Sequence, residues 1–375
     1  MALATILTAT LDQATFAREL SLAVNSVEKK TSIPILGNVL LESNGERLSI
    51  NSTDLECAFS TSMESKGTPG GRATIPAKKL LDYIRLLPAG EVALSIGENF
   101  WASLKAGRAK TRIAGMSADS FPELPKMPDT VTPIPAPGLA RLIRRTQQGI
   151  SNEMTRFTLN GALLKITEDE FIMVATDGHR LIYASIPGGG KPQLSLVPQK
   201  ALHEAGKLAG ELAISAEVQF ATDDNHLFFG AGLRTLTARK LTWNFPDYER
   251  VLPKDFKGSA TFNVAEFTSA VNLVRQAADE RSRAIKLSIK DGAIGLNAST
   301  SDSMESTSSV AAEIDGDGVD IGINADYVLD ALGAMESDLA VIRYKDSGSA
   351  LQFEPAGTGA DSLGMYKAII MPMRV

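Results

Sequence analysis

Cysteine and histidine are scarce in this chain of 375 residues, which contains one cysteine, Cys57, and three histidines. A single cysteine excludes an internal disulfide and any metal site built from several cysteines. The histidines, His179, His203 and His226, are too scattered to match the ligand spacing of a metal site. The residues therefore predict no metal and no cofactor, and the cysteine usage fits a reducing compartment.

Long apolar runs are also missing. No uncharged apolar run approaches the roughly 18 residues that a membrane span requires. The start, residues 1–11, is apolar but lacks the basic residues of a signal peptide, so we expect a first strand there and a cytoplasmic protein that does not engage membranes. The composition, with 44% hydrophobic and 22% charged residues, is that of two or three folded domains.

Motifs typical of enzymes are absent as well. The run Gly188–Lys191 is followed by proline where a phosphate-binding loop needs Ser or Thr, so it is interpreted as a turn. There is no nucleophile elbow of the Gly-x-Ser-x-Gly type. One enzyme hypothesis stays open, a hydrolase that uses Asp177 and His179 for acid–base chemistry.

What the chain does contain is a threefold internal repeat, in residues 16–122, 139–246 and 267–372. Each repeat begins with a helix-like stretch, continues with a hairpin and a strand that leads into a second helix, and ends in further strands. The Thr-Asp pairs at 53–54 and 176–177 are 123 residues apart, which is the size of a domain rather than of a solenoid repeat. We therefore predict three domains, residues 1–126, 127–254 and 255–375.

The hairpins and second helices define the expected fold class. Alternating apolar and polar residues predict hairpins within 34–54, 157–177 and 285–297, the first with an Asn-Gly turn and the third with an Asp-Gly turn. Helices are expected over 77–87, 199–209 and 325–335, which open after Pro76, Pro198 and Asn324. Antiparallel sheets with two helices per domain make an α+β fold.

Positive charge gathers on the predicted helices although the net charge is −6. The basic residues concerned are Lys78, Lys79, Arg85, Arg141, Arg144, Arg145, Lys200, Arg281 and Arg283. The last predicted helix differs, because it carries Asp326, Asp330, Glu336 and Asp338 and its own segment contains no basic residue to pair with them. Such faces are either solvated surface or contacts to phosphate that do not depend on base sequence.

Helix dimensions limit what three such domains could surround. Helices are about 10 Å across, so six in a closed ring leave a bore of only about 10 Å, whereas twelve leave roughly 30 Å. A bore of roughly 30 Å exceeds the width of a duplex, whose major groove is about 12 Å wide. A ring around DNA would therefore need two chains, and head-to-tail contacts can close such a ring.

Several motifs together identify a family resemblance that covers the full length. They are the segments Ala175–Leu181, Phe245–Tyr248, Arg250–Pro253 and Met371–Val375, together with Ser32–Asn38 and Phe121-Pro122. In this order they resemble the beta subunit of bacterial DNA polymerase III, the beta sliding clamp. The resemblance implies a non-catalytic processivity factor, a head-to-tail homodimeric ring around duplex DNA that a separate ATP-driven loader opens.

The resemblance also implies a hydrophobic cleft that receives short peptides from the polymerase III alpha subunit, the clamp loader and repair polymerases. The matching positions are Leu159, Thr176, Gly178, His179, Arg180, Leu181, Pro246, Arg250, Val251, Asn324, Tyr327, Met371, Pro372, Met373, Arg374 and Val375. The chain departs from the family pattern at Gly348 and Ala350. An adaptor that binds peptides without encircling DNA is the remaining alternative.

Two further contact surfaces follow from the same resemblance. Lys30 and Arg156 match positions where the family has basic residues facing the duplex, whereas Glu153 departs from the pattern there because it is acidic. A dimer interface is expected between the segment with Arg108 and Lys110 and the third-domain segment with Asp302 and Glu305.

Overall fold

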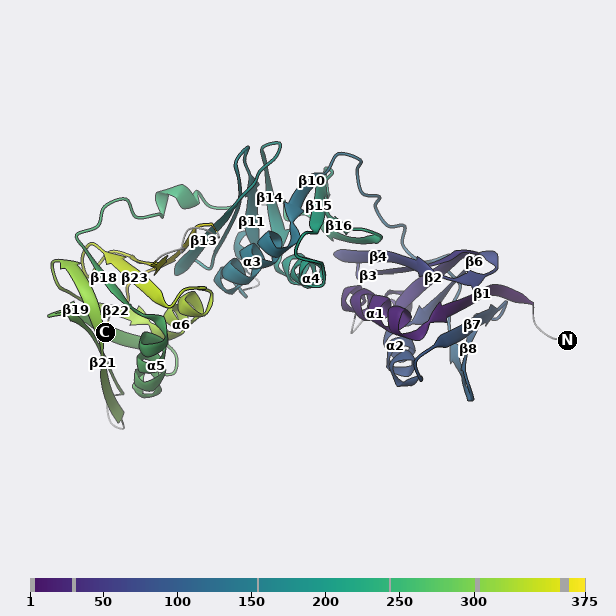
Figure 1. Ribbon diagram of the computed structural model, residues 1–375, viewed down its shortest axis with the longest axis horizontal. Helices are drawn as coiled ribbons and strands as arrows, with labels where there is room; N and C mark the ends of the chain where they lie inside the picture. The colour runs from purple at the N-terminus through teal and green to yellow at the C-terminus, as the bar shows by residue number, and fades with distance from the viewer. Residues whose placement is uncertain are drawn as a thin grey trace. The chain divides into compact units, whose positions relative to one another are not determined.

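A computed structural model describes residues 4–28, 32–153, 155–242, 244–300, 304–357 and 364–374. Three predicted site residues, Lys30, Asp302 and Val375, lie outside the described residues. The chain forms two compact units, residues 1–136 with 207–240 and residues 137–206 with 241–375 (Figure 1). None of the helices in the described ranges is both long and apolar enough to cross a membrane.

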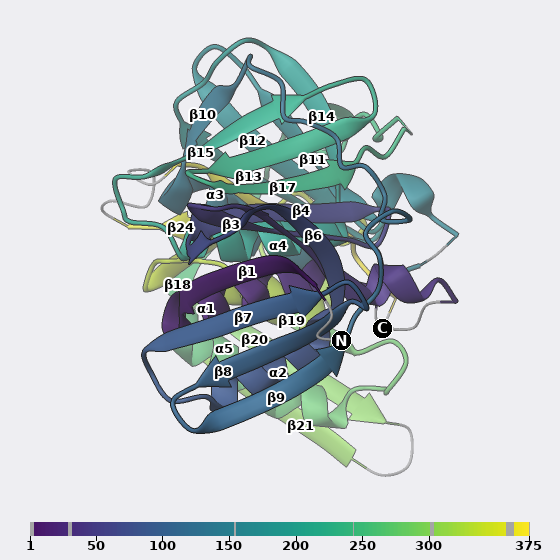
Figure 2. The ribbon, with the colours of Figure 1, turned by 90° about the vertical axis from the view of Figure 1, so that its right-hand side faces the viewer.

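The first unit contains two antiparallel sheets. The five-stranded sheet has the order β5-β1-β7-β8-β9, and the eight-stranded sheet has the order β10-β15-β16-β17-β4-β3-β2-β6. Figure 2 shows β1, β7, β8 and β9 side by side. The strands are β1 (Thr5–Asp12), β2 (Asn38–Asn44), β3 (Arg47–Thr53), β4 (Cys57–Glu64), β5 (Lys66–Gly67), β6 (Pro69–Pro76), β7 (Glu91–Gly97), β8 (Trp101–Ala106), β9 (Ala109–Ala114), β10 (Thr132–Pro135), β15 (Glu217–Thr222), β16 (His226–Ala231) and β17 (Arg234–Arg239).

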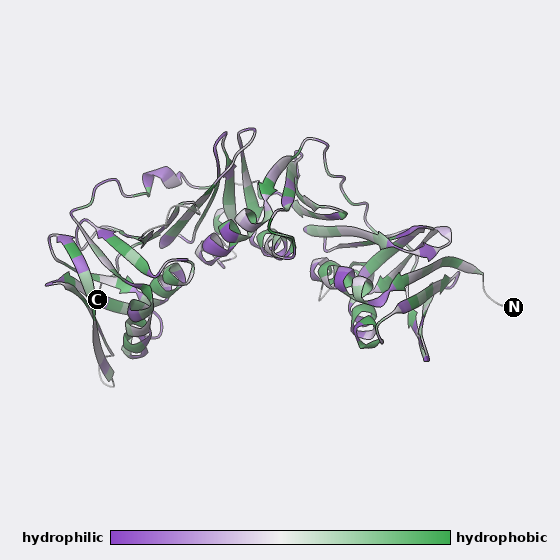
Figure 3. Cartoon of the chain, viewed as in Figure 1, coloured by the Kyte–Doolittle hydropathy of each residue, from purple (hydrophilic) through white to green (hydrophobic). Residues whose placement is uncertain are grey.

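Helices α1 (Gln13–Ala23) and α2 (Ala77–Leu86) lie side by side; α1 contacts both sheets, and α2 contacts β2 and β6 of the eight-stranded sheet. Asp12 begins α1, because its carboxylate accepts a hydrogen bond from the Thr15 amide at 2.8 Å. In α2, Leu80, Leu81 and Ile84 are buried while Lys78 is exposed, which is the spacing of an amphipathic helix. Figure 3 shows the same separation of hydrophobic and hydrophilic residues along the helices.

The second unit is built on one antiparallel sheet of twelve strands, in the order β14-β11-β12-β13-β25-β24-β23-β18-β21-β20-β19-β22. Its strands are β11 (Gly161–Ile166), β12 (Glu170–Thr176), β13 (Arg180–Pro187), β14 (Gln193–Pro198), β18 (Gly258–Asn263), β19 (Ala284–Lys290), β20 (Ala293–Thr300), β21 (Met304–Gly316), β22 (Val319–Asn324), β23 (Leu339–Tyr344), β24 (Leu351–Ala356) and β25 (Tyr366–Ile370). Its helices are α3 (Ala136–Thr146), α5 (Val264–Val274), α6 (Ala325–Gly333) and the part of α4 (Gln199–Gly210) up to residue 206.

Most of the predicted elements are confirmed, with two corrections. The three second helices begin at Ala77, Gln199 and Ala325, as their sequences predict. The third hairpin turns at Asp291 and Gly292, which both have positive φ, the geometry that an Asp-Gly hairpin turn needs. The strands expected from residues 34 and 157 are wrong at their starts, because Pro34–Gly37 and Phe157–Leu159 are 3-10 turns. Proline at the first of these positions cannot donate a sheet hydrogen bond.

The repeat is visible in the strand pairing. The β2–β3, β11–β12 and β19–β20 hairpins have matching registers, with Leu40 opposite Asn51, Leu163 opposite Val174, and Lys286 opposite Asn297. Each of these positions is 123 residues after its counterpart in the preceding repeat. The fold is therefore the predicted α+β repeat, and the boundaries at residues 126 and 254 stay a prediction.

The repeats are also joined by strand pairing. In the first unit, β17 pairs with β4 and places Thr237 opposite Ala58. In the second unit, β25 pairs with β13 and places Ile369 opposite Leu181. In each case the last strand of one repeat continues the sheet of the repeat before it.

A buried carboxylate reinforces the first of these joints. Glu19 on α1 has 4% exposure and accepts hydrogen bonds from Arg234 at 2.6 and 3.0 Å and from Thr61 at 2.8 Å. Burial alone would raise the pKa of Glu19, but the hydrogen bonds from Arg234 and Thr61 outweigh it, so the pKa lies below its ordinary value of 4.5. The carboxylate is charged and paired at neutral pH.

We predict that Glu19→Gln destabilises the protein by about 3 kcal/mol at pH 7, because the largely buried guanidinium of Arg234 loses one of its two carboxylate partners and keeps only the more exposed Glu211. The measurement is urea unfolding of both proteins at several pH values. Because the folded pKa is lowered, the stability that Glu19 contributes is present above pH 4.5 and is lost as the pH falls through the folded pKa. The difference between the two proteins should therefore shrink in acid.

The matched control is Arg18→Gln, which removes a contact to the same carboxylate from a side chain that is 60% exposed. It should change the stability by no more than about 0.5 kcal/mol. If the two substitutions changed the stability equally, Glu19 would not be a charged partner of Arg234. The same would hold if the stability difference between Glu19→Gln and the parent protein grew in acid.

Candidate functional site

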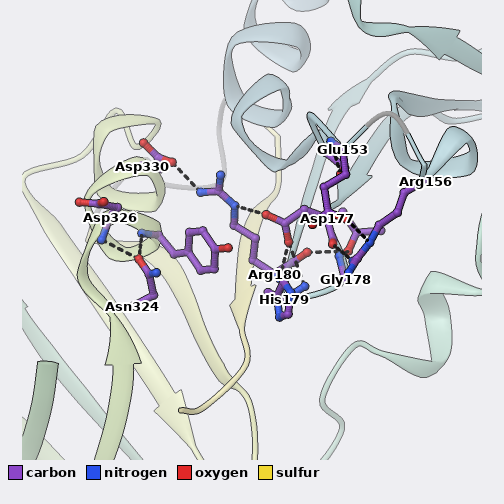
Figure 4. A network of polar contacts seen from close by, with 12 residues as sticks. Glu153, Arg156, Asp177, Gly178, His179, Arg180, Asn324, Asp326 and Asp330 are labelled. Carbon is purple, nitrogen blue, oxygen red and sulfur yellow. Dashed lines mark hydrogen bonds and ion pairs between the residues drawn. The ribbon is translucent and has the colours of Figure 1, made fainter. Parts of the chain in front are cut away.

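The turn between β12 and β13 is held by its own side chains (Figure 4). The hydroxyl of Thr176 donates to the Arg180 carbonyl at 2.6 Å and accepts from the Gly178 amide at 3.1 Å. One carboxylate oxygen of Asp177 accepts from the His179 and Arg180 amides, and the other accepts from the Arg180 guanidinium at 3.0 Å. Gly178 has a φ of 91°, which favours glycine. Asp177 is thus committed to the turn, which leaves the hydrolase hypothesis without its base.

Arg180 connects this turn to helix α6. Its guanidinium donates to Asp330 at 2.6 Å and lies 4.2 Å from the centre of the Tyr327 ring, and only 10% of the side chain is exposed. Asn324 begins α6, because its side-chain oxygen accepts from the amides of residues 326 and 327. The Asn324 amide nitrogen donates to the Ser282 carbonyl at 3.0 Å. These contacts fix the positions of Arg180 and Tyr327, while His179 stays exposed.

An apolar patch lies beside the turn. We call these residues the apolar patch: buried Ile172, Val174, Leu181, Tyr248 and Ile369, with the partly buried Leu163, Tyr183, Phe245, Val251, Leu252 and Ala350 packed against them. Its strand residues alternate along β11, β12, β13 and β25, so they share one face of the sheet. The segment 245–252 covers that face.

Polar contacts hold the covering segment at its outer side. Lys165 on β11 donates to Glu249 at 3.0 Å and its ammonium lies 5.9 Å from the centre of the Tyr248 ring. The hydrogen bond to Glu249 raises the pKa of Lys165, and burial raises the pKa of Tyr248. The Tyr248 ring lies 6.3 Å from that of Tyr183, centre to centre. The patch is therefore apolar inside with a charged rim.

The C-terminal tail borders the same patch. The Met371 amide donates to the His179 carbonyl at 3.0 Å, and the Met373 amide donates to the Gly322 carbonyl at 2.8 Å. Met371 is 40% exposed, Pro372 and Met373 are half-buried, and Arg374 is exposed. Exposed methionine beside an apolar patch is suited to varied apolar ligands, because its side chain is flexible.

Most of the predicted cleft residues lie in this region. Those brought together by the turn, the patch, α6 and the tail are Thr176, Gly178, His179, Arg180, Leu181, Val251, Asn324, Tyr327, Met371, Pro372 and Met373. Leu159 is buried within its 3-10 turn, Pro246 is exposed, and Arg250 pairs with Asp247 at 2.9 Å with 86% of its side chain exposed. Their role in peptide binding stays a prediction.

Sequence reasoning missed part of the patch. Ile172, Val174, Tyr183, Tyr248 and Ile369 were not among the predicted positions, although the strand residues show the required alternation. The signal was available for the three residues on β12 and β13. Ile369 could not be placed without knowing that β25 pairs with β13.

The arginines of α3 correct one DNA-contact prediction. Arg141, Arg144 and Arg145 all reach the carboxylate of Glu336, and Arg145 is buried with 1% exposure. Burial raises the pKa of Glu336, but the three arginines outweigh it and the pKa is lowered. Burial also lowers the pKa of Arg145. The prediction that Arg145 contacts DNA is wrong, because its guanidinium is enclosed by the protein.

The other predicted DNA contacts stay predictions. Lys78, Lys79, Arg85, Lys200 and Arg281 are exposed. Arg156 pairs with Glu153 at 2.8 Å and donates to the Asp177 carbonyl at 2.7 Å. Arg283 is half-buried, with its guanidinium 3.8 Å from Asp326.

The predicted interface residues lie beside sheet edges. Lys110 is on β9, Arg108 lies in the turn before it, and Glu305 is on β21. Within the described ranges, β9 pairs with β8 alone. In the same part of the chain, residues 304–311 of β21 pair with β20 alone, because β18 pairs with residues 312–316. Both segments thus present an unpaired backbone edge.

Comparison with known proteins supports the resemblance to the DNA polymerase III beta subunit. Family models of the DNA polymerase III beta subunit match in three parts, the N-terminal domain at residues 7–125, the central domain at 133–247 and the C-terminal domain at 249–374. A relative from Caulobacter vibrioides named beta sliding clamp is 32% identical, over 98% of this chain and 99% of the relative. A beta sliding clamp of Pseudomonas aeruginosa is 30% identical over the same shares.

Solved structures of sliding clamps have the same fold as this chain. A Pseudomonas aeruginosa sliding clamp bound to griselimycin superimposes with a TM-score of 0.92 at 28% identity, covering 98% of this chain and all of the other. The repeated fold is that of the DNA clamps. The chain belongs to the DNA polymerase III beta subunit family, the beta sliding clamps.

Proposed function

We propose that two copies of this chain form a head-to-tail ring around duplex DNA and that the apolar patch receives short peptides from replication and repair proteins. Membership of the family assigns the chain a DNA sliding clamp role, as a non-catalytic subunit that confers processivity. The partners we expect are the DNA polymerase III alpha subunit, the clamp loader and repair polymerases. The division into domains at residues 126 and 254 is part of this proposal.

The observation that carries the ring is the repeated strand pairing. The last strand of the second repeat, β17, pairs with β4, and the last strand of the third, β25, pairs with β13. By the same rule β9, the last strand of the first repeat, should pair with β21, the third-repeat counterpart of β4 and β13. Both have unpaired edges, so the rule is satisfied when β9 of one copy meets β21 of a second copy.

The register of this contact follows from the repeat. Ala58, Leu181 and Glu305 occupy equivalent positions, since they lie opposite Thr53, Thr176 and Ser299, which are spaced by the repeat length of 123 residues. The β8–β9 and β16–β17 hairpins match, with Ala109 and Arg234 as the first residues of their second strands. Arg112 is then the counterpart of Thr237, which lies opposite Ala58. The proposed interface thus places Arg112 opposite Glu305, with Lys110 on the same face.

DNA contact in this ring is sequence-independent. The exposed basic residues of α2 and α4 would meet phosphate, which carries no base information. The net charge of −6 keeps such attraction weak, which suits a ring that slides.

We predict that Glu305→Arg and Arg112→Glu each weaken the dimer about tenfold, because like charges then face one another across the joint. The double variant should recover most of the loss, since it restores an opposite pair. Sedimentation equilibrium over a protein dilution series measures all four dissociation constants. Lys290→Glu, an exposed change on β19, is the control and should match the parent protein. If the losses of dimer affinity from the two single variants added up in the double variant, Arg112 would not lie opposite Glu305.

We also predict that deleting residues 371–375 abolishes peptide binding and leaves the dimer intact, because the deletion begins after the last residue of β25 and removes the edge of the apolar patch. The probe is a fluorescent peptide carrying the clamp-binding segment of a DNA polymerase III alpha subunit, followed by anisotropy. Leu194→Ala, an exposed change on β14 away from the patch, is the control. Unchanged peptide affinity in the truncated protein would overturn the site assignment.

A further inference from the structure

The first unit contains a pocket of about 650 Å³ that the proposed function does not use. Its floor is formed by residues of β2, β3, β4 and β17, and its cover by residues 118–127. The volume lies within the range of about 300–1,000 Å³ that is usual for ligand sites. The covering segment is held at both ends. Met116 exchanges backbone hydrogen bonds with Thr74 on β6, and the Met127 sulfur lies against Gly230 on β16, where a Cβ would come within 3.0 Å of it.

The floor of this pocket is the counterpart of the apolar patch, in the same strand register. Adding 123 to Leu40, Asn51, Ala58 and Ser60 gives Leu163, Val174, Leu181 and Tyr183. Thr237 lies opposite Ala58 as Ile369 lies opposite Leu181. The backbone architecture that presents the apolar patch is therefore present a second time.

The cover is equivalent as well. Phe121 and Pro122 in the cover match Phe245 and Pro246, which begin the segment over the apolar patch. Keeping this alignment, Leu124 corresponds to Tyr248 and Met127 to Val251. These four apolar residues of the cover are all half-buried.

The floor differs in chemistry. The Ser60 hydroxyl donates to the Asn51 side-chain oxygen at 2.6 Å, and the Asn51 amide donates to the Glu42 carboxylate at 3.2 Å. Glu42 replaces the equivalent Lys165, so the charge at this corner is reversed. Arg72 is opposite Glu42 in the sheet, but its guanidinium contacts Asp119 at 3.4 Å. Among the described residues, no cation forms an ion pair with Glu42.

We propose that this pocket is a second peptide-binding site, selective for an extended segment with a lysine or arginine side chain. The basic side chain pairs with Glu42, polar side chains meet Asn51, Ser60 and Thr237, and one apolar side chain packs under Phe121 and Leu124. Charge supports this occupant, because Glu42, Asp119 and Glu123 line the pocket against Arg72 and Lys126. The apolar patch and this pocket would then select different partners on related scaffolds.

The test uses two pools of capped octapeptides and the full-length protein. Each peptide has one leucine and otherwise serine, threonine or asparagine, except for one position that is lysine or arginine in the basic pool and aspartate or glutamate in the acidic pool. Peptides retained after ultrafiltration are counted by mass spectrometry. We expect at least tenfold more retention from the basic pool.

Variants locate the binding. Glu42→Gln, which keeps the shape of the side chain, should lower retention of the basic pool about tenfold, and Asn51→Val, which introduces the residue of the apolar patch, should lower it too. Glu98→Gln, an exposed carboxylate of the same unit, is the control and should have no effect. Equal retention of the two pools, no retention, or retention unchanged by Glu42→Gln would overturn the proposal.

The deletion of residues 371–375 separates this site from the proposed function. It removes nothing from the pocket, so the truncated protein should retain the basic pool as the parent does. Loss of retention on truncation would assign the binding to the apolar patch and contradict a second site.

Discussion

Backbone pairing between successive repeats is the constraint on which the rest of this structure depends. β17 extends the sheet of the first repeat through β4, and β25 extends that of the second through β13. These hydrogen bonds join segments far apart in the sequence, and each joint brings a covering segment over one face of the sheet. Without the β25–β13 pair, Ile369 would leave the apolar patch and Met371 could not reach the His179 carbonyl.

Ion pairs also link the repeats in both units. Glu19 forms an ion pair with Arg234 in the first unit, and Glu336 forms ion pairs with the three arginines of α3 in the second. A largely buried pair such as Glu19–Arg234 contributes little net stability but is costly to break, so it favours one arrangement of the paired elements over others. The second cluster has more arginines than carboxylates, which leaves positive charge on α3, with Arg144 half-exposed at its surface.

Related scaffolds can carry different chemistry because the strand register, and not the side chains, defines the face. Val174 and Leu181 make that face apolar in the second unit, whereas the equivalent Asn51 and Ala58 leave space and polar groups in the first. Asn51, Ala58 and Ser60 are smaller than the equivalent Val174, Leu181 and Tyr183, and this loss of bulk accounts for the volume of the pocket in the first unit. Function in such a protein resides in the side chains added to a repeated backbone.

The sequence was sufficient for features that local patterns determine. The second helices could be predicted because Pro76, Pro198 and Asn324 precede clear helical periodicity, and the third hairpin because Asp291-Gly292 suits its turn. The burial of Arg145 could not be predicted, since three closely spaced arginines on a helix are also typical of an exposed basic face. The register between β25 and β13, and hence the place of Ile369, depends on contacts almost two hundred residues apart. Motif resemblance placed Arg180 and Met371, but their contacts with Asp330 and His179 came from the structure.

Topological linkage to DNA is the most direct test of the central claim. The protein would be loaded onto a nicked circular plasmid with a clamp loader and ATP and washed in high salt, and half of the sample would be linearised before retained protein is measured. The ring predicts retention on circles and loss from linear DNA, because phosphate contacts fail at high salt on both forms. The control is a loader that is active on another clamp. With such a loader, equal loss of the protein from circular and linear DNA would contradict encirclement and favour a peptide-binding adaptor.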